Sequence, residues 1–147
     1  MNNELNDRQF FPAALADRLY VIGDPFFNQY LVRGDKASAL IEMGISATTD
    51  EAVRQLAGLN AKPDYLIVAH PHVDHINGLN NIRDAFPEAT VIAGKGAEEF
   101  VAHPKVAASL VAEDRFMTDF MAARGIRSVH SPLDTAPSLA GCRIAGD

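Results

Sequence analysis

The 147-residue sequence has one cysteine, no excess of positive charge and no apolar run of membrane-spanning length. The single Cys142 cannot form an intramolecular disulfide and is typical of a reducing compartment. A membrane span needs about 20 consecutive apolar residues, and the polar N-terminus, residues 1–7, lacks the basic and apolar regions of a signal peptide. The net charge of −6 argues against general binding to nucleic acids or anionic membranes. We therefore expect a cytoplasmic protein that binds neither.

Apolar residues are plentiful enough for one core, at 48% of the chain. At this length we expect a single domain over residues 1–147, with a loosely ordered N-terminus over residues 1–15. Short apolar runs bounded by turn residues predict strands at 19–22, 30–32, 39–41, 65–69 and 89–93. Helical spacing predicts helices over 48–60, 79–86 and about 105–124. Strands first, then alternating helices and strands, predict an α/β fold with a mixed sheet.

Two signals predict helix ends. Thr48 followed by Glu51 has the spacing of a capping box at a helix start. Gly125, after the long apolar stripe, is a predicted C-terminal cap. His103, just before Pro104, is interpreted as a solvated residue at a helix start.

Three histidines and one aspartate cluster at His70, His72, Asp74 and His75. They follow the predicted strand 65–69, so they lie at its carboxyl end, where open α/β sheets place their ligands. Clustered imidazoles repel one another when protonated, which favours a metal ligand role. In an extended loop His70 and His72 point the same way, while Asp74 lies two residues further and His75 turns aside, an arrangement that suits two neighbouring ions. Nitrogen and carboxylate donors suit zinc, iron or manganese better than calcium or magnesium.

Residues 69–79 resemble the His-x-His-x-Asp-His motif of the metallo-β-lactamase superfamily. The predicted hairpin around residues 28–44 and the helix and strand within 82–91 resemble the family in order and spacing. The resemblance covers residues from about 18 to 100. One departure is Glu42, where the family usually has aspartate after the second hairpin strand.

The resemblance implies the N-terminal half of an αββα sandwich with two divalent metal ions at one edge. It implies His70 and His72 on a first ion and Asp74 and His75 on a second, with zinc favoured over iron or manganese. It implies a hydrolase whose metal-bound hydroxide attacks an ester, thioester, lactone, amide or phosphoester of a small-molecule substrate. In that scheme Asp74 is also catalytic, because it orients the attacking water.

The family's later ligands have weaker counterparts in this chain. Segment 129–138 resembles the family's later His-rich segment, which makes His130 and Asp134 candidate ligands, and Asp147 is a third. A simpler interpretation makes residues 137–145 a strand that precedes a missing histidine. Family members usually have roughly 200 residues or more. The chain is therefore expected to lack a C-terminal segment or to complete its fold as a homodimer.

Two other functions remain open. Some relatives with this fold are dioxygen-binding or redox two-iron proteins, but these often have glutamate at the second motif position. His72 occupies that position here and favours zinc-type hydrolysis. The other alternative is a non-catalytic metal-binding fragment or assembly module.

Overall fold

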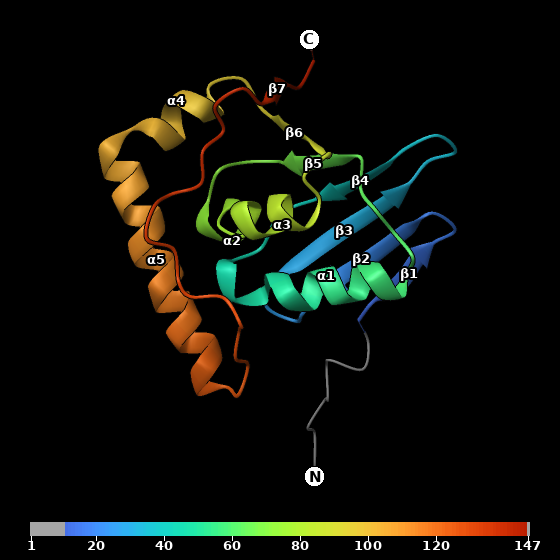
Figure 1. Ribbon diagram of the computed structural model, residues 1–147, viewed down its shortest axis with the longest axis horizontal. Helices are drawn as coiled ribbons and strands as arrows, with labels where there is room; N and C mark the ends of the chain where they lie inside the picture. Colours follow the sequence, from blue (N-terminus) through green and yellow to red (C-terminus); the bar gives the residue numbers. More distant parts are fainter. Residues whose placement is uncertain (1–10, 147) are drawn as a thin grey trace.

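Seven strands form one mixed sheet in the computed structural model, which describes residues 11–146 (Figure 1). The strands lie side by side in chain order and are β1 (Ala13–Ala16), β2 (Leu19–Gly23), β3 (Asn28–Arg33), β4 (Ser38–Ile41), β5 (Tyr65–Val68), β6 (Thr90–Ala93) and β7 (Arg143–Ile144). Neighbours from β1 to β4 are antiparallel, and those from β4 to β7 are parallel. The predicted α/β class with a mixed sheet is confirmed.

The helices connect these strands. They are the short 3-10 helix η2 (Ser46–Thr48), α1 (Thr49–Gly58), α2 (Val73–Ile76), α3 (Leu79–Ala85), α4 (Ala97–Ala102) and α5 (Pro104–Ala123). Figure 1 shows α1, α2 and α3 over one side of the sheet, with α5 along one end of it. No helix among residues 11–146 is long and apolar enough to cross a membrane.

The two faces of the sheet differ in burial because side chains alternate along each strand. A row of leucines, Leu31, Leu40 and Leu66, pairs across β3, β4 and β5, and each is fully buried. The row on the opposite face is apolar but only partly buried: Val21, Tyr30, Ile41, Ile67 and Ile92. The core therefore lies between the first face and its helices, as in one half of a two-sheet sandwich.

Four elements of the structure were not predicted: β1, η2, α2 and α4. Loose order was predicted through residue 15, yet β1 at Ala13–Ala16 pairs with β2, and this part of the prediction is wrong. The two strands pair through their backbone groups, and the side chains of this short alanine-rich segment give no pattern that predicts a strand. Helix α4 was not predicted, and β7 occupies only two residues of the predicted strand 137–145. The prediction for residues 1–10 lies outside the described residues.

The predicted helix caps have different outcomes. The capping box at Thr48 is wrong, because the Thr48 hydroxyl donates to the Ile45 carbonyl and Glu51 instead pairs with Arg54. Gly125 does cap α5: its φ is +80°, its backbone N–H donates to the Ala122 carbonyl, and the N–H of the next residue, Ile126, donates to the Met121 carbonyl. A left-handed backbone of this kind is easiest for glycine.

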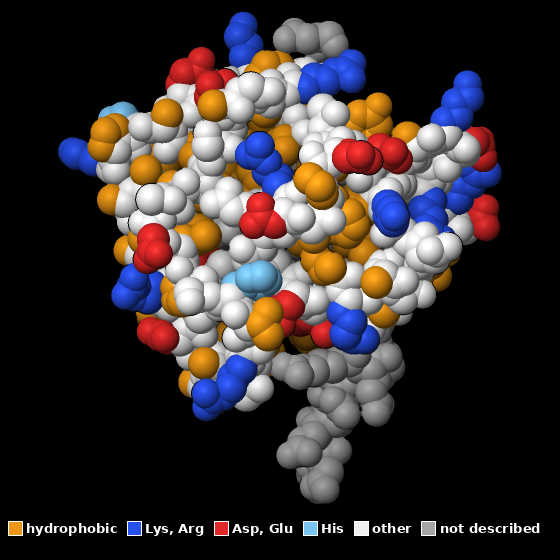
Figure 2. All heavy atoms as spheres, viewed as in Figure 1, with side chains coloured by type: hydrophobic (Ala, Val, Ile, Leu, Met, Phe, Trp, Pro, Cys, Tyr) orange, Lys and Arg blue, Asp and Glu red, His pale blue; other side chains and the backbone are white. Residues whose placement is uncertain are grey.

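Charged side chains of both signs are scattered over the face drawn in Figure 2, with no broad field of one sign. This pattern accords with the modest net charge of −6. The expectation that the chain binds no nucleic acid and no membrane stays a prediction.

Candidate metal centre

The site is built at the carboxyl ends of β4 and β5. These strands are parallel neighbours, with Ile41 opposite Ile67, so the residues that follow each strand meet at one edge of the sheet. Beyond β5 the chain bends at Ala69 and His70, and His72 has an extended backbone conformation with φ −85° and ψ 161°. Residues from Val73 onward then form the single turn of α2.

The turn of α2 corrects one prediction. Asp74 and His75 were expected on an extended loop, with alternating directions. They lie instead on a helical turn that begins after His72, so the alternation ends there. Helical geometry brings the His75 ring back over the preceding loop, where it contacts His70.

The structure brings the four predicted motif residues together. The ring of His70 lies 4.7 Å from that of His72 and 3.9 Å from that of His75, measured between ring centroids. The Nε2 atom of His75 lies 3.2 Å from Oδ2 of Asp74. His70 and His72 are exposed, while Asp74 and His75 are partly buried. The cluster is therefore open to solvent on the side of its first two histidines.

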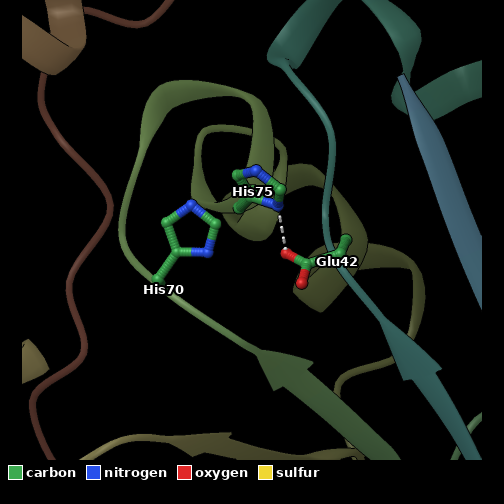
Figure 3. Close-up of side chains that lie close together, drawn as sticks. All are labelled: Glu42, His70 and His75. Atoms are coloured by element: carbon green, nitrogen blue, oxygen red, sulfur yellow. Dashed lines mark hydrogen bonds and ion pairs between the residues drawn. The ribbon is translucent and has the colours of Figure 1, made fainter.

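A fifth residue, Glu42, joins this cluster from the end of β4. Its Oε2 atom lies 2.7 Å from Nδ1 of His75, and Figure 3 shows the carboxylate pointing at that ring. One potential ligand atom from each of Glu42, His70 and His75 lies within 4.8 Å of the other two. Glu42 is only 8% exposed, and burial raises the pKa of its carboxyl group above the ordinary value, while His75 lowers this pKa.

Sequence reasoning noted Glu42 only as a departure from the family pattern. The signal that could have found it is its position directly after the strand that neighbours β5. That neighbour relationship is a property of the sheet order, which a local motif does not contain.

Main-chain hydrogen bonds hold the two halves of the site together. The Met43 N–H donates to the His75 carbonyl at 3.0 Å, and the Gly78 N–H donates to the Gly44 carbonyl at 2.9 Å. A Cβ atom at Gly78 would lie 2.0 Å from the Met43 carbonyl oxygen. This close approach, and not the backbone conformation, requires glycine at position 78. The φ of Gly78 is −75°, which any residue can adopt.

A groove lies beside His72. It has a volume of about 290 Å³ and runs between the motif loop and the helices α4 and α5. Its apolar wall includes Val73, Phe100 and Val106, and Lys105 and Glu113 add one charge of each sign. Pro71 and His72 place the motif loop along one side of this groove.

Among the described residues, no contact joins the weaker candidate ligands His130 and Asp134 to the cluster. His130 and Asp134 are both exposed. The His130 backbone N–H is bound by the Ser128 hydroxyl, which also lies 3.5 Å from Asp50 at the start of α1. Asp147 lies outside the described residues.

His103 behaves as the sequence predicts for a helix start. It is exposed and is the N-cap of α5, where its Nδ1 accepts a hydrogen bond from the Lys105 backbone N–H at 3.3 Å. It therefore belongs to the cap of this helix.

The chemistry of the donors fits a transition-metal ion. Two ligands about 2.1 Å from a tetrahedral zinc ion are about 3.4 Å apart, close to the 3.2 Å between His75 Nε2 and Asp74 Oδ2. Imidazole and carboxylate donors in this number are those that zinc, iron and manganese use in proteins.

The fold and this cluster define an α/β domain with a candidate metal centre at the carboxyl edge of its sheet. The sequence profile of the Metallo-beta-lactamase superfamily matches residues 23–141, and the chain belongs to this superfamily. The resemblance predicted from the motif is thereby confirmed. No curated protein gives a significant match to the chain.

Solved structures show the same fold. A motif mutant of a metallo-β-lactamase from Cronobacter sakazakii is 24% identical with a TM-score of 0.57, and the match covers 62% of this chain and 37% of that chain. A class B3 di-zinc metallo-β-lactamase from an Alaskan soil metagenome is 21% identical with a TM-score of 0.58, covering 69% and 39%. A subclass B3 enzyme of Bradyrhizobium japonicum is 21% identical with a TM-score of 0.53, covering 61% and 35%. The matched region spans well under half the length of these relatives.

Proposed function

We propose that the chain provides part of the metal centre of a hydrolase, with His70 and His72 on one ion and Asp74 and His75 on a second. The observation that supports this most directly is the convergence of these four side chains at the end of β5. Membership of the superfamily supports a metal-dependent hydrolase at the coarse level. Zinc is the proposed metal, with iron and manganese as alternatives.

When bound, such ions lower the pKa of water towards neutrality and polarise the bond to be broken. The residues of this chain have separate tasks. His70 and His72 bind through exposed rings that a hydrated ion can reach from solvent. Asp74, whose carboxylate lies beside His75 Nε2, would bind the second ion and orient the attacking water. Water and substrate therefore meet on the exposed side of the cluster.

The proposed substrate is a small molecule with an ester, thioester, lactone, amide or phosphoester bond. The groove beside His72 supports this, because its apolar wall can exclude water from a bound acyl or aryl group. Lys105 and Glu113 line the same groove with opposite charges, so the groove does not select a substrate by the sign of its charge.

The described residues supply four motif ligands for two ions. Further donors would come from water, from another segment of a longer chain or from a second copy of this chain. His130 and Asp134 are less suited, because no contact among the described residues joins either of them to the motif residues, which contact one another.

The test measures zinc content and affinity of the purified chain, and cleavage of a p-nitrophenyl ester with and without a chelator. We expect zinc binding by the wild-type chain, an affinity lowered at least about 100-fold in His72→Ala, and esterase activity that the chelator removes. The control is His130→Ala, which should leave zinc affinity unchanged. Equal metal content and thermal stability in His72→Ala and wild type would overturn the proposal. Stoichiometric iron with visible absorbance would favour the two-iron alternative.

A further inference from the structure

We propose that Glu42 is a positioning residue that sets the tautomer of His75, so that the Nε2 atom of this ring is left free for the metal. The inference rests on the role proposed for His75 above. Glu42 lies outside the His-x-His-x-Asp-His motif, and we assign to it the task of orienting one histidine of that motif.

The two nitrogens of His75 have different surroundings. Nδ1 lies 2.7 Å from the Glu42 carboxylate, a hydrogen bond to a side chain that is 10% exposed. Nε2 lies 3.2 Å from Asp74, whose side chain is 43% exposed. A neutral imidazole has a single N–H, and the acceptor it meets decides which nitrogen keeps the proton. The shorter and more buried contact keeps it on Nδ1, so the lone pair of Nε2 points towards the side of Asp74.

The backbone of Glu42 supports a role for its side chain. Its φ is +68°, in the left-handed region that residues other than glycine, asparagine and aspartate seldom adopt. A glycine or asparagine would suit this backbone better, but neither has the length of glutamate. Residues retained in such conformations are often part of a functional site. A glutamate at this position is explained by its length, because its carboxylate reaches the His75 ring.

The acceptor and the ring are also held on segments bonded to each other. The Glu42 N–H donates to the Ile67 carbonyl on β5 at 2.9 Å, and the next residue, Met43, donates to the carbonyl of His75. The contact between Glu42 and His75 is thus made between two backbone segments that are already fixed. This rigidity is what a positioning group needs.

A direct ligand role for Glu42 is the competing explanation, because potential ligand atoms of Glu42, His70 and His75 lie within 4.8 Å of one another. The geometry favours the hydrogen bond. Two ligands of one tetrahedral zinc ion lie about 3.4 Å apart, whereas the Glu42–His75 contact is 2.7 Å. That distance is the length of a charge-assisted hydrogen bond.

The first measurement records the tautomer of His75 by ¹H–¹⁵N correlation of the histidine rings in the metal-free chain above pH 8. We expect the Nδ1–H form in wild type and a shift towards Nε2–H in Glu42→Asn, whose shorter side chain does not reach the ring. The thermal midpoint of Glu42→Asn should hold or rise, because asparagine tolerates a positive φ. A merely structural role for Glu42 predicts a fall instead.

The second measurement compares cobalt and zinc affinity in Glu42→Asn, in Glu42→Gln and in the exposed control Glu88→Gln. Affinity should fall about 10- to 100-fold in Glu42→Asn, less in Glu42→Gln, which keeps an acceptor, and not in Glu88→Gln. The visible spectrum of bound cobalt should keep its wavelength in Glu42→Gln.

Three results would overturn the inference: an unchanged tautomer in both variants, an unchanged affinity in both, or a cobalt spectrum that shows a lost ligand in Glu42→Gln. A wild-type chain that binds neither zinc nor cobalt would instead overturn the proposed function. The tautomer measurement needs no metal and would still decide whether Glu42 sets the proton on His75.

Discussion

Two buried carboxylates in this chain have opposite surroundings. Asp114, on α5, is fully buried and accepts three hydrogen bonds, from the Ser46 backbone N–H, the Ser46 hydroxyl and the Leu133 backbone N–H. Glu42, at the end of β4, is 8% exposed, and its side-chain contact is the ring of His75. Asp114 therefore joins three segments of backbone, whereas Glu42 faces a group of potential metal ligands.

The difference separates a carboxylate that stabilises the fold from one that serves a site. A buried charge is tolerated when its hydrogen bonds are supplied by the protein, as they are for Asp114. A buried carboxylate that backbone donors do not bind can still accept a hydrogen bond from a neighbouring side chain, as Glu42 does from His75. Variants of each group should therefore change different measurements, and the predictions below use that contrast.

The largest expected effect is on stability, from Asp114→Ala. Removing this carboxylate leaves buried donors of Ser46 and Leu133 without a partner, which should lower the free energy of unfolding by about 3 kcal/mol or more. Urea unfolding measures it. The control Asp119→Ala, exposed on the same helix, should change stability by no more than about 0.5 kcal/mol. Zinc affinity of folded Asp114→Ala should equal that of wild type, and a large fall in that affinity would contradict the separation.

The second largest effect, from Gly78→Ala, should appear both in the free energy of unfolding and in the zinc affinity. In Gly78→Ala the new Cβ would meet the Met43 carbonyl, so we expect a loss of about 2–3 kcal/mol of stability. Because Met43 also donates to the His75 carbonyl, zinc affinity should fall as well. The matched control is Gly58→Ala at the end of α1, where a Cβ has no neighbour within 4 Å. A Gly78→Ala protein as stable as Gly58→Ala would refute the close-approach argument.

The smallest expected effect is that of the Glu98 carboxylate on the reactivity of the Cys142 thiol. Burial, and then the negative charge of Glu98, raises the pKa of the Cys142 thiol above its ordinary value. A raised pKa leaves less thiolate at pH 8, so iodoacetamide should alkylate the folded chain more slowly than the urea-unfolded chain, and faster as the pH rises. Glu98→Gln should increase the folded rate modestly. Equal rates in folded and unfolded chains would rule out this shift.

Much of the fold follows from local signals. The strands at β2 to β6 are short apolar runs bounded by turn residues, and the glycine that ends α5 stands where its apolar stripe stops. β1 and β7 were harder, because their pairing depends on neighbours distant in the sequence or on backbone groups alone. The capping box failed because Glu51 has a nearer partner in Arg54.

The sequence by itself determined where the candidate metal ligands stand, because His70, His72, Asp74 and His75 follow one buried strand in a single short motif. The tertiary structure alone decided how they meet. The turn of α2 aims His75, and the parallel pairing of β4 with β5 brings in Glu42 from a distant part of the chain. The physical reason is that a motif specifies residue types over a few positions, whereas the surroundings of each nitrogen depend on which strands are neighbours in the sheet.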